Sequence, residues 1–129
     1  MDPSEIKFAA LVPMLPVTNV ARTTAFYEAL GFKVGNSHTP EAAEEPVWAW
    51  LYCGDAHVMI NREEHDVHAT HNSAAVWLYC ADVKAMHALL QQRGLDVGEI
   101  SYPFYNRHGE FHVHDPDGYA IFIAHADGL

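Results

Sequence analysis

A glutamate and two histidines alternate along one short segment near the C-terminus, namely Glu110, His112 and His114. Side chains two residues apart on a β-strand point to the same side of a sheet, so these three would share one space. Imidazole and carboxylate groups exchange protons near neutral pH and also bind divalent metals. The segment predicts either acid–base or metal chemistry, led by His112 and Glu110, or a polar pocket with neutral, hydrogen-bonded histidines. His57 is a further candidate donor.

A second histidine pattern is His65-x-x-His68-x-x-His71. Its spacing alone would suit a metal, but it lies in a polar stretch without strand or helix periodicity to fix the three rings. A metal site needs ligands held at defined distances. We therefore interpret this stretch as a solvated loop.

Aromatic residues offer a different chemistry, which is binding by stacking. Trp48, Trp50 and Tyr52 alternate along one predicted strand, and Trp77 and Tyr79 along another. An aromatic ring that faces a groove stabilises a flat or cationic ligand by roughly 0.5–2 kcal/mol beyond its buried area. The alternative is that these rings fill a core or cover a contact between subunits.

An aromatic loop precedes the histidine segment and contains Tyr102, Phe104 and Arg107. Arg107 would pair either with an anionic group of a ligand or with a nearby carboxylate such as Glu110. The two rings add to the candidate ligand-binding residues.

The elements that would position these residues form two similar halves, the second beginning 63 residues after the first. Val20 aligns with Val83, Gly31 with Gly94, and Gly35 with Gly98. Each half reads as strand, helix and three strands, or βαβββ. We expect one α+β domain, residues 1–129, made of modules 7–61 and 74–126 joined by a linker at 62–73.

In the first module we predict a strand ending at Val17. Pro13 and Pro16 place it at a sheet edge, because proline cannot donate to a strand ladder. A helix follows over 20–30, ended by Gly31. Its apolar residues at helical spacing are Ala21, Ala25, Phe26, Ala29 and Leu30. Further strands are predicted at 32–36, 47–53 and 56–61.

In the second module Asp82 caps a helix predicted at 83–93. Strands are predicted at 74–80, 97–101, 109–114 and 119–125. The last two are joined by the turn sequence Asp115-Pro116-Asp117-Gly118.

The charge balance excludes some classes of partner. Acidic residues number 17 against 7 basic ones, giving a formal net charge of −10. Nucleic acid and anionic membranes need Lys and Arg, so neither is an expected partner. The charge favours a cationic ligand, or serves solubility alone. With no apolar run long enough to span a membrane and no basic-then-apolar leader, we expect a cytoplasmic location.

Cys53 and Cys80 fall within apolar predicted strands. We expect them to be reduced core thiols located in the middle of their strands. Apolar surroundings raise a thiol pKa, which argues against a nucleophilic role.

Two segments resemble a known family. Val12 to Val20, followed by Ala25-Phe26-Tyr27 and Leu30-Gly31-Phe32, is similar to the opening of the vicinal oxygen chelate superfamily. Glu110 to Tyr119 resembles its closing hairpin. The family includes glyoxalase I, extradiol dioxygenases, fosfomycin-modifying enzymes and bleomycin resistance proteins. The resemblance implies curved sheets forming a cup with the helices outside.

The resemblance also implies four metal-ligand positions facing the cup, which fall here on Val12, Met59, Ala75 and Phe122. None carries an oxygen, nitrogen or thiolate donor for a divalent metal. We therefore expect no metal and no cofactor at the family site.

The chain is most similar to the metal-free bleomycin resistance branch, whose members act by sequestration as dimers. The expected function is binding of a cationic or aromatic, antibiotic-like molecule at a homodimer cleft. The alternative is a lyase, dioxygenase or transferase-type enzyme using His112 and His114. The candidate ligand-binding residues are Trp48, Trp50, Trp77, Tyr79, Tyr102, Phe104, Arg107, His112, His114 and Phe122.

Overall fold

The protein is described from a computed structural model, which covers residues 1–64, 67 and 74–129. The predicted linker therefore lies mostly outside the described residues. The two long helices are α1 (Val20–Ala29) and α2 (Val83–Gln92). The strands are β1 (Met14–Val17), β2 (Lys33–His38), β3 (Trp48–Cys53), β4 (Ala56–Arg62), β5 (Ala75–Cys80), β6 (Glu110–His114) and β7 (Ala120–His125). Short 3₁₀ turns, η1 and η3, span Pro3–Glu5 and Ala126–Gly128.

The strands form two mixed sheets, one in each half of the chain. The first has the order β1-β4-β3-β2, and the second has the order β5-β7-β6. In each sheet the first strand of the half lies parallel to the last one, β1 beside β4 and β5 beside β7. The predicted α+β class is confirmed, as is the edge position of β1 with its proline.

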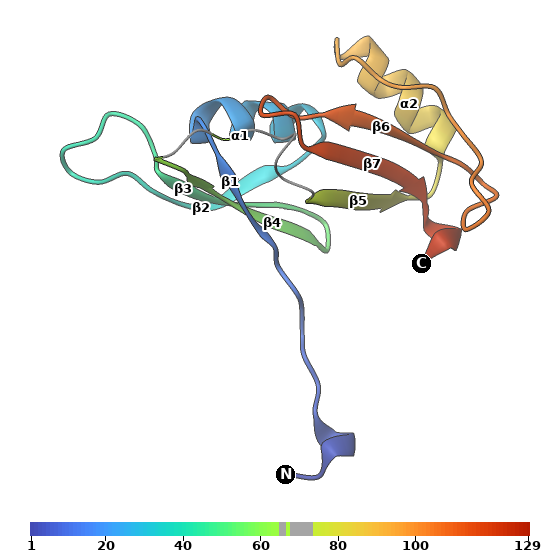
Figure 1. Ribbon diagram of the computed structural model, residues 1–129, viewed down its shortest axis with the longest axis horizontal. Helices are drawn as coiled ribbons and strands as arrows, with labels where there is room; N and C mark the ends of the chain where they lie inside the picture. Colours follow the sequence, from blue (N-terminus) through green and yellow to red (C-terminus); the bar gives the residue numbers. More distant parts are fainter. Residues whose placement is uncertain (65–66, 68–73) are drawn as a thin grey trace.

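Each helix covers one face of its own sheet (Figure 1). Helix α1 contacts β2, β3 and β4, whereas α2 contacts β6 and β7. The buried strand residues, such as Leu51, Ile60, Phe111 and Ile121, alternate with side chains on the opposite face. We call this opposite side of each sheet its open face. No helix among the described residues is long and apolar enough to cross a membrane.

Helix α1 begins and ends as its sequence predicts, and its most buried residues are additional to the apolar set that was predicted. The Asn19 side chain accepts a hydrogen bond from the Arg22 N–H, and Gly31 follows the helix at φ 99°. Of the apolar residues predicted at helical spacing, Phe26 and Leu30 pack against the core, whereas Ala21 and Ala25 are exposed. The fully buried residues of the helix are Val20, Thr23 and Tyr27. Tyr27 packs edge-on against Phe32 at 5.2 Å between ring centroids, and this contact sets the rotation of the helix.

The strand predicted at 97–101 is wrong. The segment pairs with β6 only through the Gly98 N–H to the His112 carbonyl and a bridge between Ser101 and Glu110. Between these two contacts the segment advances by three residues, from Gly98 to Ser101, while β6 advances by two, from His112 to Glu110. This mismatch is that of a β-bulge, which interrupts a regular ladder. Strand β2 shifts register at the equivalent Gly35, so the interruption recurs in both halves.

The two halves are joined through the turn between β6 and β7. Asp117, whose side chain is 3% exposed, accepts hydrogen bonds from the Thr18 N–H at 3.0 Å and the Thr18 hydroxyl at 2.5 Å. Arg22 approaches the same carboxylate at 3.4 Å. The Tyr119 hydroxyl donates to the Pro16 carbonyl at 2.8 Å. The β6–β7 turn of the second half therefore anchors the start of α1 in the first half through these hydrogen bonds.

Replacing Asp117 by Ala should lower the free energy of unfolding by about 2–3 kcal/mol, because buried hydrogen bonds to a charged acceptor are lost together. Urea denaturation followed by circular dichroism measures this. Asp55→Ala, in the exposed β3–β4 turn, is the control and should change stability by less than about 0.5 kcal/mol. Equal stability of the two variants would contradict the proposed anchoring.

Candidate functional site

The open face of the second sheet carries a row of three rings across its strands. Trp77, Phe122 and His112 are cross-strand partners on β5, β7 and β6. The Trp77 and Phe122 rings stack with centroids 4.3 Å apart and planes 5° from parallel. His112 lies 5.5 Å from Phe122 at a tilt of 40°. The predicted sharing of one face by these residues is confirmed.

Glu110 fixes the orientation of this row from the edge strand β6. Its side chain is buried, at 3% exposure, and accepts a hydrogen bond from the Trp77 indole N–H at 3.1 Å. The Tyr105 hydroxyl donates to its other oxygen in a short hydrogen bond. Ala124 lies on β7 between Tyr79 of β5 and Glu110, and this small side chain leaves room for the indole to reach across.

These contacts correct two expectations about Glu110. The Glu110 carboxylate is buried and accepts hydrogen bonds from Trp77 and Tyr105. Among the described residues it forms no ion pair with Arg107 and no metal-binding group with the two histidines. The hydrogen bond to Glu110 raises the pKa of the Tyr105 hydroxyl. Sequence reasoning missed Tyr105 as a site residue, although its place in the aromatic loop, five residues before Glu110, was the available signal.

His112 and His114 point to the open face together, as predicted. Their rings meet edge-on at 5.2 Å, and His114 is exposed. Gly98 lies against the inner of the two, where a Cβ would come within 3.3 Å of the His112 ring. A larger residue at Gly98 would therefore displace His112.

The open face of the first sheet holds the other two tryptophans. The Trp50 indole N–H donates to His57 Nδ1 at 3.1 Å, and Tyr52 stacks on the same imidazole at 6.2 Å. Trp50 is the cross-strand partner of Met59, which in turn pairs with Met14. His57 therefore holds an indole and is not grouped with His112. Trp48 lies one step further along, beside Asn61.

The remaining candidate residues lie at the surface. Tyr79 is 40% exposed, Tyr102 is 59% exposed and Phe104 is fully exposed. Arg107 is exposed and forms no ion pair within the part of the chain that the structure describes. His65, His68 and His71 lie outside the described residues.

The four positions implied for the family metal do not fit a metal here. Met59, Ala75 and Phe122 lie on β4, β5 and β7, and Val12 precedes β1. Aliphatic and aromatic side chains have no donor atom, and a thioether suits only soft metals. Within residues 1–64, 67 and 74–129, no three His, Cys, Asp or Glu side chains form a group that could hold a metal ion.

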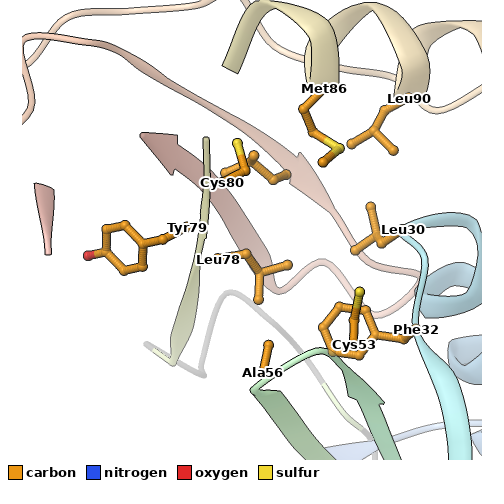
Figure 2. Close-up of a pocket in the computed structure, with 10 residues that line it drawn as sticks. Leu30, Phe32, Cys53, Ala56, Leu78, Tyr79, Cys80, Met86 and Leu90 are labelled. Carbon is orange, nitrogen blue, oxygen red and sulfur yellow. The ribbon is translucent and has the colours of Figure 1, made fainter. Parts of the chain in front are cut away.

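A separate apolar cavity of about 120 Å³ lies at the seam between the two halves (Figure 2). Met86 and Leu90 reach into it from α2, opposite Leu30 and Phe32, while the Tyr79 ring turns away. Among the described residues, no Asp, Glu, Lys, Arg or His side chain lines it, and the titratable side chains in its lining are Cys53, Tyr79 and Cys80. Its lining consists of Leu30, Phe32, Cys53, Ala56, Leu78, Tyr79, Cys80, Met86, Leu90 and Ile123.

Both cysteines border this cavity, and their expected burial is only partly correct. Cys53 and Cys80 are the last residues of β3 and β5, not mid-strand residues, and both are free thiols. Cys53 is exposed, because its strand ends at the β3–β4 turn, so it is not a core thiol. Cys80 is partly buried, and burial raises the pKa of its thiol.

Thiol modification should therefore proceed in two phases. With a disulfide reagent at pH 8, we expect Cys53 to react at least about ten-fold faster than Cys80, because the thiolate is the reactive form and a raised pKa reduces it. The slow phase should accelerate as the pH rises above 9. Absorbance of the released thiolate measures both phases. Cys53→Ser should retain only the slow phase and Cys80→Ser only the fast one, whereas equal rates would contradict this assignment.

The family model of the Glyoxalase/Bleomycin resistance protein/Dioxygenase superfamily matches residues 8–123. This match covers most of the chain, both open faces included, and the chain belongs to that superfamily. No curated protein sequence matches the chain.

Solved structures share the fold at low sequence identity. A bleomycin-binding protein complexed with bleomycin is 18% identical, with a TM-score of 0.73, covering 92% of this chain and 98% of its own. The bleomycin-binding protein of bleomycin-producing Streptomyces verticillus, complexed with copper(II)-bleomycin, is 21% identical, with a TM-score of 0.74 and coverages of 94% and 98%. A bleomycin resistance determinant encoded on transposon Tn5 is 20% identical, with a TM-score of 0.70 and coverages of 92% and 98%. This confirms the predicted fold family.

Proposed function

We propose that this protein binds a flat or cationic small molecule on its aromatic open faces, without a metal and without making or breaking a bond. The observation that carries the proposal is the Trp77–Phe122 stack held by Glu110, in which Phe122 occupies one of the four positions that the family resemblance implies for a metal ligand. Rings fixed in place provide a stacking surface at a small cost in side-chain entropy.

Three further features support binding over catalysis. Val12, Met59, Ala75 and Phe122 lack metal donors. Glu110 accepts its hydrogen bonds from Trp77 and Tyr105 and so serves to orient the aromatic row. The net charge of −10 raises the local concentration of a cationic guest.

The guest that best fits these features is an antibiotic-like molecule with planar rings and positive charge. Two structural neighbours were solved with bleomycin and with copper(II)-bleomycin. We infer that the present chain sequesters a molecule of this kind. Tyr102, Phe104 and Arg107, exposed on the loop before β6, would contact the parts of the guest that project beyond the rings.

Metal-free bleomycin should quench the tryptophan fluorescence in a saturable way. Trp77→Ala should weaken binding at least about ten-fold, because a stacking partner is lost. Leu89→Ala, an exposed apolar residue on α2, is the control and should bind like the parent.

The same samples test the enzyme alternative. Recovery of the guest unchanged supports sequestration. Chemical conversion of it, or stoichiometric zinc, nickel or manganese that is lost in the variant with both His112→Ala and His114→Ala, would favour an enzyme.

We also propose that the working unit is a homodimer. The open faces expose apolar side chains, including Met14 at 52% and Tyr79 at 40%. The N-terminal arm leaves the body of the chain (Figure 1), and its Phe8 and Leu11 are each 88% exposed. Apolar surface of this extent is typical of an interface, and a second copy would cover it.

Replacing Phe8 and Leu11 together by Asp should shift a dimer toward the monomer, because two charges would enter the covered surface. Light scattering after gel filtration measures the mass, and circular dichroism checks that the fold is kept. Leu89→Asp, on the outer face of α2, is the matched control and should leave the mass unchanged. A parent protein that is monomeric at micromolar concentration would contradict the homodimer.

A cytoplasmic location is part of the same proposal. Two free thiols, one of them exposed, suit a reducing compartment.

A further inference from the structure

We propose that Trp77, backed by Glu110, forms a subsite for organic cations that donate no hydrogen bonds, such as quaternary ammonium groups. The inference rests on the proposed function and specifies the chemical class of the guest at that site. Three observations support it. The indole ring is accessible, its N–H donates to the Glu110 carboxylate, and this carboxylate already accepts two hydrogen bonds.

One face of the Trp77 ring is available to a guest. Phe122 covers the other face at 4.3 Å with the planes almost parallel. The residue is 40% exposed in spite of the stack.

The charge behind the ring makes this face attractive to cations. An indole whose N–H donates to a carboxylate gains electron density, and a cation over an aromatic face is drawn by that density. Glu110 supplies such a carboxylate at 3.1 Å from the indole nitrogen. Because Glu110 is 3% exposed, water screens its charge less than it screens a surface carboxylate.

The same burial decides which cations fit. Both carboxylate oxygens of Glu110 already accept hydrogen bonds, one from Trp77 and one from Tyr105. A cationic guest on the Trp77 ring is therefore attracted to the Glu110 carboxylate across the indole, and it forms no direct ion pair with that carboxylate. A primary ammonium or guanidinium group would lose water from its N–H donors without replacing it. A quaternary ammonium has no such donors, so it loses less on leaving water.

Three probes separate these contributions: benzyltrimethylammonium, its uncharged carbon analogue of the same shape, neopentylbenzene, and the smaller primary ammonium, benzylammonium. Proton NMR titration at fixed ionic strength gives each Kd from the shifts of the indole resonances. We expect the quaternary cation to bind about ten-fold more tightly than the neutral analogue, and several-fold more tightly than the primary ammonium.

Two variants identify the source of the preference. Glu110→Gln removes the charge with little change of shape, and should reduce the preference for the cation over neopentylbenzene to about two-fold or less. Trp77→Phe keeps a ring but removes the N–H, and should reduce it in the same direction with Glu110 intact. Glu28→Gln, an exposed carboxylate on α1, changes the net charge equally and should leave the preference unchanged.

The outcomes are distinguishable from those of the proposed function. Equal affinity of the parent for the cation and for neopentylbenzene would overturn the cation subsite, and so would benzylammonium binding as tightly as the quaternary probe. An unchanged preference in both Glu110→Gln and Trp77→Phe would also overturn it. If no probe binds, the subsite is overturned as well, and bleomycin binding then decides the proposed function separately.

Discussion

The hydrogen bond from the Trp77 indole to the buried Glu110 carboxylate is the constraint on which the second open face depends. It spans the width of a three-stranded sheet, from β5 to β6 over the small Ala124. It satisfies a carboxylate that would be costly to bury alone, and Tyr105 satisfies the remaining oxygen. The same bond that makes burial of Glu110 tolerable also keeps the indole in the plane required for stacking on Phe122.

The fold supplies the faces on which this bond forms. Alternation along each strand sends Phe111 and Val113 to the helices and leaves His112 between them on the open side. The bulge at Gly98 brings the edge segment close to His112. Asp117 then fixes the second half to the start of α1, so both open faces belong to one framework.

Much of this arrangement could be predicted from sequence, because strand alternation and helix caps are local rules. That Trp77, His112 and Phe122 lie on one face follows from the alternation of side chains along each strand. The partner of Glu110 does not, because Trp77 lies 33 residues away and reaches it only through strand pairing. The most buried residues of α1 also escaped prediction, since Tyr27 packs on Phe32 while the alanines at helical spacing stay outside the core.

Both open faces carry an indole held by its N–H, although the two indoles lie on strands that are not equivalent in the two halves. In each, an indole on the open face donates its N–H to an acceptor, Trp50 to His57 and Trp77 to Glu110. On the first face the Trp50 N–H donates to an imidazole nitrogen, His57 Nδ1. The second presents its indole beside an anion. A guest that meets both faces would thus be held by stacking on one and by stacking with charge on the other, which favours a molecule that is planar along its length and cationic at one end.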